Sequence, residues 1–444
     1  MYIKRVIDNY LKDWCSEKKR KPMLIHGARQ VGKSSAVRNL AKNFDYFVEV
    51  NFEQNRKVHS YFDNDLDVKE ICDNISVQYK NPIIPNKTLL FFDEIQVCPR
   101  AITALRYFYE NYPELHVIAA GSLLEFALEK LPSFGVGRIE SVYMYPFSFQ
   151  EFMIACGEEL LWKKVCKASP EKPINSAFHE SCIALLKKYL VLGGMPAVVS
   201  EYVKNKNTLA AQKELNNLIN SLKSDFSKYK QRVPELRIAT VFESVVKQSG
   251  GSFNFAKVDA LNYRQVRENL ELLQKAGLVI PVICTSANGI PLGAEANYRK
   301  QKMILLDTGI FQTILGLEIA DLLLSNDFEV INKGAIAEQF VGLELIKSAP
   351  CYRSQNLYFW TREKTNSSAE VDYLIQKGEK IIPVEVKSGT SGKMQSMHLF
   401  LKEKKSEYGI RTSLENFGQY DKIKVYPLYA IGNIKHNKNI ENVL

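Results

Sequence analysis

The stretch G27-A-R-Q-V-G-K-S34 decides the fold of the N-terminal part of this chain. It follows an apolar run, P22-M-L-I-H26, that is typical of a short buried strand, and it precedes a helical run that ends near Lys42. A strand, a glycine-rich loop and a helix in this order form the context in which the pattern GxxxxGK[ST] marks a phosphate-binding loop. The sequence therefore predicts a P-loop.

The residue types in this loop suit a nucleoside triphosphate. Glycines let the backbone curl round a phosphate, and successive N–H groups with the helix N-terminus supply positive potential. Lys33 adds a full charge at the β- and γ-phosphates, and Ser34 offers its hydroxyl to Mg²⁺. The expected nucleotide contacts come from Gly27, Ala28, Arg29, Gln30, Val31, Gly32, Lys33, Ser34 and Ser35.

Two further apolar runs end in polar side chains that suit the same site. T88-L-L-F-F-D-E94 is typical of a central parallel strand that delivers Asp93 and Glu94 at its carboxyl end, where ligands bind in open α/β sheets. Asp93 is expected to hold Mg²⁺ through its water shell, and Glu94 to polarise the attacking water. H116-V-I-A-A-G-S122 ends in Ser122, which either senses the γ-phosphate or caps the next helix.

Length and composition indicate a globular chain of several domains. At 444 residues, with 46% hydrophobic and 24% charged residues, the chain is too long for one ordinary core. It shows no run of 18 apolar residues and no leader pattern, so we expect a cytoplasmic protein without a membrane partner. Eight dispersed cysteines lack CxxC spacing and are expected to be reduced. A net charge of +10 permits nucleic-acid binding but is a mild excess at this length.

The pattern of apolar and polar residues changes three times along the chain. Residues 1–157 alternate short apolar runs with helical stretches, which is typical of a parallel sheet wrapped by helices. Residues 158–228 are almost wholly helical, and residues 229–328 combine short helices with a hairpin marked by A287-N-G289. Residues 329–444 begin with one helix and continue as strands. We therefore predict an α/β fold with a P-loop NTPase sheet, a helical lid, a winged helix and a C-terminal α/β domain.

The predicted winged helix leaves two interpretations open. Its second helix presents Tyr263, Arg264 and Arg267, which is a plausible phosphate-contacting face. A few basic residues are also an ordinary solvated face, and the same fold serves as a spacer or a protein contact. The winged helix therefore either touches DNA or only separates its neighbours.

A second candidate site lies in V371-D-Y-L-I-Q-K-G-E-K-I-I-P-V-E-V-K387. Side chains alternate along a strand, so Glu385 and Lys387 share a face, and Asp372 joins them if the two strands pair through the turn K377-G-E-K380. Acidic residues in this arrangement suit a divalent metal ion that generates hydroxide for hydrolysis. Glu338, in the preceding helix, adds a fourth candidate, while a cross-strand ion pair is the alternative interpretation.

The quoted motifs resemble a known family. The P-loop, F92-D-E-I-Q96, A120-G-S122 and G137-R-I-E-S-V-Y-M-Y-P-F-S-F-Q-E-F152 are similar to the bacterial and archaeal AAA-type ATPases that carry a C-terminal domain of unknown function. The resemblance extends over nearly the whole chain. It implies an AAA-like ATPase core, a helical lid with a winged helix, and a C-terminal domain related to PD-(D/E)xK nucleases. Where the family commonly has a small polar run after the glycine, this chain has S122-L-L.

The same resemblance makes Arg138 the candidate arginine finger, acting within its own subunit or on a neighbouring one. A fixed surface arginine is the alternative. If Arg138 acts across an interface, the chain must assemble with itself.

These patterns together predict an ATP-binding and ATP-hydrolysing enzyme that uses Mg²⁺. In the first hypothesis the protein is associated with DNA, and Glu338, Asp372, Glu385 and Lys387 cleave nucleic acid with a second divalent metal ion, Mg²⁺ or Mn²⁺. In the alternative, the protein is a nucleotide-gated signalling or scaffold ATPase, and its C-terminal domain only binds a protein partner. A nucleotide kinase is disfavoured because the long C-terminal part does not resemble one.

Overall fold

The computed structural model describes residues 2–63, 65–129, 131, 135, 137–226, 234–316, 333–362, 369–389, 392 and 394–435. They form two compact units, which are described separately. The first unit consists of Met1–Tyr145, Lys275–Gly277 and Pro350–Ser354, and the second of Pro146–Gln274, Leu278–Ala349 and Gln355–Leu444. The predicted domain boundaries after residues 228 and 328 lie outside the described residues. The division into four domains stays a prediction.

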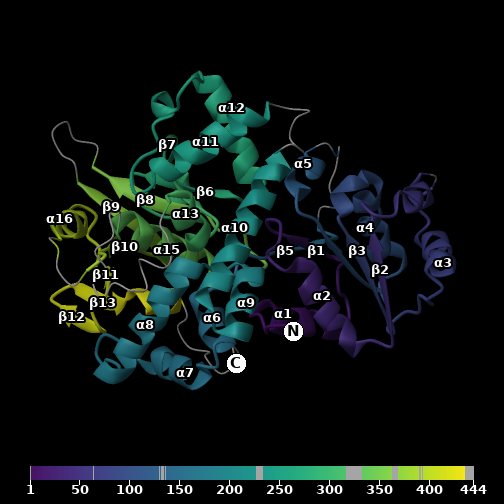
Figure 1. The fold of residues 1–444 in the computed structure, drawn as a ribbon, viewed down its shortest axis with the longest axis horizontal. Coiled ribbons are helices and arrows are strands. Elements are labelled where there is room, and N and C mark those ends of the chain that lie inside the picture. The colour runs from purple at the N-terminus through teal and green to yellow at the C-terminus, as the bar shows by residue number, and fades with distance from the viewer. Residues whose placement is uncertain are drawn as a thin grey trace. The chain divides into compact units, whose positions relative to one another are not determined.

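The first unit is built on a parallel sheet of five strands in the order β2-β3-β4-β1-β5 (Figure 1). The strands are β1 (Met23–His26), β2 (Tyr46–Asn51), β3 (Thr88–Asp93), β4 (His116–Ala120) and β5 (Glu140–Tyr143). Every residue of β1, β3 and β4 is buried, as expected for strands whose two faces are covered by helices. The parallel α/β sheet predicted for a P-loop NTPase is therefore confirmed.

Helices cover both faces of this sheet. They are α1 (Ile7–Ser16), α2 (Lys33–Leu40), α3 (Val68–Tyr79), α4 (Pro99–Asn111) and α5 (Leu124–Leu128), with 3-10 turns η1 (Ala41–Asn43), η2 (Arg56–Phe62) and η3 (Ile95–Val97). The core on the β3 side contains Phe52, Phe62, Phe92 and Phe108, whose rings meet edge to face at 5.6–5.9 Å between centroids. Such aromatic pairs stabilise a core beyond their buried area.

The second unit begins with a helical layer, as the sequence predicts for this region. Its helices are α6 (Phe149–Ala155), α7 (Glu159–Lys167), α8 (Ser176–Leu192), α9 (Pro196–Asn205), α10 (Thr208–Ser224), α11 (Glu235–Lys247), α12 (Tyr263–Lys275), α13 (Thr308–Ile314), α15 (Lys333–Lys347) and α16 (Gln395–Glu403). Gly193 ends α8 with a φ of 74°, and Pro196 opens α9 at its first turn. Among the described residues, no helix combines the length and the apolar character that crossing a membrane would require.

The strands of the second unit form one mixed sheet in the order β12-β13-β11-β10-β9-β8-β6-β7. They are β6 (Val279–Thr285), β7 (Ala296–Leu305), β8 (Leu357–Thr361), β9 (Glu370–Lys377), β10 (Lys380–Val386), β11 (Gly409–Ser413), β12 (Gly418–Tyr420) and β13 (Ile423–Pro427), with 3-10 turns η5 (Phe255–Lys257), η6 (Leu292–Glu295) and η7 (Leu428–Lys435). The expected antiparallel pairing through the K377-G-E-K380 turn is confirmed.

The hairpin of β6 and β7 belongs to the same sheet as the C-terminal strands (Figure 1). Strand β6 pairs in parallel with β8, with Val282 opposite Leu357 and Cys284 opposite Phe359. Because backbone hydrogen bonds are continuous from β12 to β7, the predicted wing is an edge of the C-terminal sheet. This arrangement brings side chains of the hairpin next to residues far along the chain.

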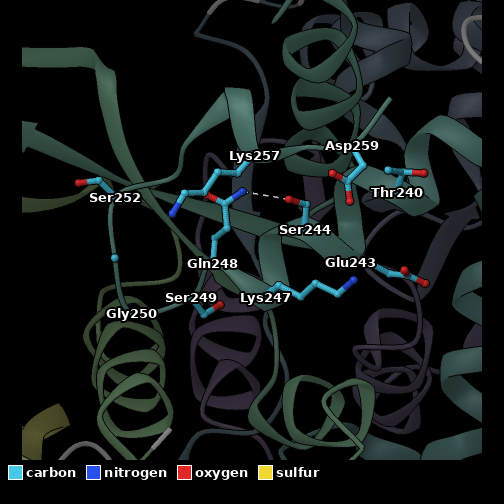
Figure 2. Close-up of a pocket in the computed structure, with 11 residues that line it drawn as sticks. Thr240, Glu243, Ser244, Lys247, Gln248, Ser249, Gly250, Ser252, Lys257 and Asp259 are labelled. Carbon is cyan, nitrogen blue, oxygen red and sulfur yellow. Dashed lines mark hydrogen bonds between the residues drawn. The ribbon is translucent and has the colours of Figure 1, made fainter. Parts of the chain in front are cut away.

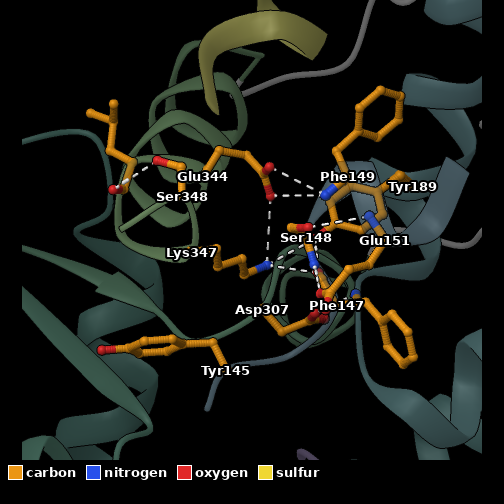
Figure 3. A network of polar contacts seen from close by, with 12 residues as sticks. Tyr145, Phe147, Ser148, Phe149, Glu151, Tyr189, Asp307, Glu344, Lys347 and Ser348 are labelled. Atoms are coloured by element: carbon orange, nitrogen blue, oxygen red, sulfur yellow. Dashed lines mark hydrogen bonds and ion pairs between the residues drawn. The ribbon is translucent and has the colours of Figure 1, made fainter. Parts of the chain in front are cut away.

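A buried polar network joins α15 to the start of α6, and the residue before α13 to the segment before α9 (Figure 3). The Glu344 carboxylate accepts hydrogen bonds from the Phe149 N–H at 3.1 and 3.2 Å, and Lys347 Nζ donates to the Phe147 carbonyl at 3.0 Å. The Asp307 carboxylate accepts from the Gly194 N–H at 2.6 Å. Burial raises the pKa of Glu344 to about 7, against the opposing effect of the Lys347 ammonium. The Asp307 contacts with the Gly194 and Ile310 N–H groups give this residue a structural role in the second unit.

Candidate functional site

The loop between β1 and α2 has the backbone that a phosphate-binding loop needs. Gly27, Gln30 and Gly32 have φ values of 148°, 62° and 96°, all in the range that favours glycine, and glycine occupies two of these three positions. A Cβ atom at position 27 would lie 2.3 Å from the carbonyl oxygen of Met144. The loop can therefore pass this carbonyl only because residue 27 is glycine.

Lys33, the first residue of α2, points back into the loop. Its Nζ atom donates to the carbonyl oxygens of Gly27 and Ala28, both at 2.8 Å, and the residue is only 8% exposed. Burial lowers the pKa of Lys33 to about 8, although the nearby Glu94 and Asp93 carboxylates act in the opposite direction. The loop thus holds a buried ammonium against its own carbonyl groups.

Ser34 and Asp93 meet at the end of β3, as the sequence predicts. Ser34 Oγ donates to Asp93 Oδ1 at 3.0 Å, and Asn51 Nδ2 donates to Asp93 Oδ2 at 3.3 Å. Burial raises the pKa of Asp93, and the Ser34 hydrogen bond opposes this effect. Sequence analysis missed Asn51, which lies opposite Asp93 in the pairing of β2 with β3. Its position as the last residue of an apolar strand was the available signal.

Glu94 and Ser122 also come together. Glu94 has a φ of 52°, and its Oε2 atom accepts from Gln96 Nε2 at 2.6 Å and from Ser122 Oγ at 3.3 Å. Ser122 Oγ in turn accepts from Arg29 Nε at 3.3 Å. The first residue of α5 is Leu124, and its N-cap, Leu123, makes no side-chain cap hydrogen bond. The Ser122 hydroxyl therefore forms hydrogen bonds with Glu94 and Arg29. In the alternative interpretation this hydroxyl would cap the following helix.

Arg138 lies in an ion pair on the surface of the first unit. Its Nε atom contacts Glu110 Oε1, and Arg106 Nε contacts the same oxygen at 3.0 Å. The Arg138 side chain is 40% exposed. This position agrees with a surface arginine, and it also leaves part of the guanidinium accessible.

The four residues of the second candidate site occupy α15, β9, β10 and the residue that follows β10. Asp372 Oδ2 accepts from the Val386 N–H at 2.8 Å, and Lys387 Nζ donates to Glu385 Oε1 at 2.8 Å. Glu385 Oε2 is buried and has no hydrogen-bond partner in the structure. Burial raises the pKa of Glu338 to about 7 and that of Glu385 to about 7.

Sequence analysis missed the residue at the centre of this cluster, Lys302 of β7. Its Nζ atom lies 2.7 Å from Glu338 Oε1, 2.5 Å from Glu370 Oε1 and 3.6 Å from Asp372 Oδ1. Burial alone lowers the pKa of Lys302, but the surrounding carboxylates outweigh it and raise the pKa above its usual value. No signal in the sequence marks this lysine, because the contact depends on how the hairpin joins the sheet.

The arrangement gives no support to the expected second divalent metal ion. Among the described residues, no group of three or more His, Cys, Asp or Glu side chains is placed to hold a metal ion. The acidic side chains are instead gathered round two ammonium groups, those of Lys302 and Lys387.

The exposed face of α12 carries paired charges. Arg264 Nε contacts Glu268 Oε1 at 2.9 Å, and Arg267 Nε contacts Glu271 Oε1 at 2.9 Å. Tyr263, at the start of the helix, is largely exposed. The predicted phosphate-contacting residues are therefore on the surface, with a carboxylate beside each arginine.

A polar cavity of about 580 Å³ lies at the end of α11 (Figure 2). Lys247 and Lys257 line it together with Glu243 and Asp259, so its charged side chains balance. The Gln248 side chain connects α11 to the loop that follows it. Its Nε2 atom donates to Ser244 Oγ at 2.9 Å, and its Oε1 atom accepts from the Asn254 N–H at 2.7 Å.

Three family models match separate parts of the chain. Residues 19–153 match an AAA domain, residues 183–321 match a domain of unknown function (DUF8612), and residues 333–431 match another domain of unknown function (DUF4143). The first match covers the five-stranded sheet and its loop, so the N-terminal part is similar to an AAA domain with a P-loop. The two other models leave the rest of the chain without an assigned activity.

Solved structures give weaker similarities. The Walker-type ATPase PABY2304 of Pyrococcus abyssi is 15% identical, with a TM-score of 0.45, over 71% of this chain and 96% of that chain. Cdc6p from Pyrobaculum aerophilum is 12% identical, with a TM-score of 0.23, over 72% and 96%. At these values neither similarity extends to function. No curated protein matches the chain significantly.

Proposed function

We propose that the N-terminal domain binds ATP with Mg²⁺ and hydrolyses it at the P-loop. One observation carries the proposal: the Ser34 hydroxyl and the Asp93 carboxylate lie 3.0 Å apart, beside a buried lysine at the start of α2. A hydroxyl and a carboxylate are hard oxygen ligands of the kind that Mg²⁺ takes in phosphate sites. The residues present therefore fit a magnesium ion, which would supply charge neutralisation at the phosphates.

Each residue then has a distinct role. The Lys33 ammonium exchanges its two carbonyl partners, Gly27 and Ala28, for phosphate oxygens, which are stronger acceptors because they are charged. Backbone N–H groups of residues 27–35 and the N-terminus of α2 surround the phosphates. Ser34 and Asp93 would hold the magnesium ion, which would neutralise charge on the phosphates.

Glu94 is the proposed water-orienting residue. Ser122 and Gln96 hold its carboxylate at 3.3 and 2.6 Å, which fixes the direction in which the remaining oxygen points. A positioned carboxylate next to the γ-phosphate aligns the attacking water. Because Ser122 also contacts Arg29 of the loop, its hydroxyl is placed to respond when phosphate enters.

The test compares nucleotide binding and turnover in three variants. We expect Lys33→Ala to lose Mg·ATP affinity at least tenfold, and Glu94→Gln to keep the affinity while its turnover falls at least a hundredfold, as for loss of a residue that acts mainly in the transition state. Lys42→Ala, which changes an exposed lysine just after α2, is the matched control and should keep both. Wild-type protein without Mg·ATP affinity, or Lys33→Ala with unchanged affinity and turnover, would refute the proposal.

For the C-terminal domain we propose partner binding, with metal-dependent cleavage of DNA as the competing function. Partner binding is supported by the ammonium groups that already neutralise Glu338 and Glu385. The competing function is supported by the gathering of Glu338, Asp372, Glu385 and Lys387 at one end of β9 and β10.

Incubation of plasmid DNA with the protein and Mn²⁺ or Mg²⁺ separates these two functions. We expect no cleavage above the level of the Asp372→Ala and Lys387→Ala variants. Cleavage by the wild type that both variants lose would establish the nuclease instead.

A further inference from the structure

The buried lysine of β7 points to a property of the C-terminal cluster that is independent of the ATPase function. We propose that the Lys302 ammonium is the resident cation of this cluster, and that its charge among Glu338, Glu370 and Asp372 keeps a divalent metal ion from binding there. The cluster then needs no metal ion.

Charge compensation is the first argument. Three carboxylates surround one ammonium nitrogen at 2.7, 2.5 and 3.6 Å, and the Lys302 side chain is 2% exposed. Buried carboxylates without a counter-charge are strongly unfavourable, so a folded protein supplies a cation to such a cluster. Here the cation is a side chain of the protein itself, so it does not dissociate on dilution.

The shape of the cage is the second argument. The contacts at 2.5 and 2.7 Å are charge-assisted hydrogen bonds, and an ammonium group has three donors with which to make them. Another side of the ammonium faces the ring of Phe359, whose centroid lies 5.2 Å from Nζ. An aromatic face attracts an ammonium, whereas Mg²⁺ and Ca²⁺ take six or more oxygen ligands or waters. The carboxylates and the ring therefore hold the Lys302 ammonium in place.

Backbone pairing fixes the lysine in place. Lys302 pairs with Val282 of β6 on one side and forms an isolated bridge with Ser252 on the other. Its main chain is thus held from both sides. Because the strand is held on both sides, the Lys302 side chain could leave its buried position only by moving independently of the main chain.

The origin of the lysine is the third argument. The carboxylates come from α15 and β9, whereas Lys302 comes from β7, the hairpin strand at one edge of the sheet. The part of the chain that matches DUF4143 begins at residue 333, so it contains the acids without this cation. The continuous sheet brings the cation to them.

The test measures Mn²⁺ binding to the nucleotide-free full-length protein by isothermal titration. Binding at the C-terminal cluster is defined as the part of the signal that Asp372→Asn removes, which separates it from binding at the P-loop. The variants are Lys302→Met, which keeps the length of the side chain and removes its charge, and Lys302→Arg, which keeps the charge. Each is measured with and without Asp372→Asn.

We expect the wild type and Lys302→Arg to show no Asp372-dependent Mn²⁺ binding up to millimolar concentration. Lys302→Met should gain Asp372-dependent Mn²⁺ binding, with a dissociation constant at least tenfold below this concentration. Mn²⁺ should also raise the melting temperature of this variant. Lys302→Met/Asp372→Asn should lose the gain.

Asp372-dependent binding of Mn²⁺ by the wild type would overturn the proposal, and so would a folded Lys302→Met variant that gains none. If Lys302→Met does not fold even with Mn²⁺, the comparison of Mn²⁺ binding by the wild type and by Asp372→Asn tests the proposal. Failure of the ATPase proposal would leave these outcomes unchanged, because no arm of the experiment uses nucleotide.

Discussion

Replacing Glu344 by glutamine should remove a defined part of the pH dependence of the second unit's stability. Glu344 is fully buried, and burial raises its pKa from 4.5 to about 7. Below pH 4.5 the carboxyl group is protonated in both the folded and the unfolded chain. Between pH 4.5 and 7 the unfolded chain releases the proton while the folded chain keeps it, so the free energy of unfolding falls as the pH rises.

The size of the effect follows from the change in pKa. At about 1.36 kcal/mol for each pH unit, the change from 4.5 to about 7 corresponds to about 3 kcal/mol, most of it lost between pH 5 and pH 7. Glutamine cannot titrate, but it keeps an oxygen that can accept from the Phe149 N–H. The stability difference between the wild type and Glu344→Gln should therefore change by about 2 kcal/mol between pH 5 and pH 7.

Urea unfolding at pH 5, 6, 7 and 8, followed by the fluorescence of Trp162 and Trp360 in the second unit, measures the difference. Glu379→Gln, which changes an exposed residue in the turn between β9 and β10, is the matched control and should follow the wild type at every pH. A stability difference between the wild type and Glu344→Gln that stays constant from pH 5 to pH 8 would refute the assigned pKa and its cause.

Three further predictions concern the first unit. Gly27→Ala should abolish Mg·ATP binding, measured by titration, since its Cβ would meet the Met144 carbonyl oxygen at 2.3 Å. Ser122→Ala should lower the ATP turnover number about tenfold or more with unchanged nucleotide affinity, because Glu94 loses one hydrogen bond that positions it; equal losses in both quantities would contradict this role. If Arg138 acts on a neighbouring subunit, ATP turnover per subunit rises with protein concentration in the wild type and stays constant in Arg138→Ala. The same concentration dependence in both proteins would make Arg138 a surface residue that pairs with Glu110.

The P-loop was predictable from sequence because its chemistry is local. Gly27, Lys33 and Ser34 lie within eight residues, and the loop's strand and helix follow from the apolar runs on either side. Asp93 and Glu94 followed from a general property of parallel sheets, whose strands end at one edge. Asn51 was missed because it is a common polar residue at a strand end, and its role depends on the register of β2 with β3.

The C-terminal cluster was only half predictable for the opposite reason. Asp372, Glu385 and Lys387 are placed by the alternation of two adjacent strands, which a sequence pattern reveals. Lys302 precedes Asp372 by 70 positions, and it reaches the cluster because β6 pairs with β8 rather than standing apart as a wing. Local patterns carry no information about such a pairing.

This difference bears on how the two acidic sites of the chain should be understood. At the P-loop, the Asp93 carboxylate accepts hydrogen bonds only from neutral groups, Ser34 and Asn51, among the contacts described, so a cation adds charge that those donors do not supply. At the C-terminal cluster the counter-charge is built in, and Lys302 holds oxygens of Glu338 and Glu370 at hydrogen-bond distance. Since a divalent ion would have to displace a buried ammonium, the built-in charge of Lys302 sets the second site apart from the first.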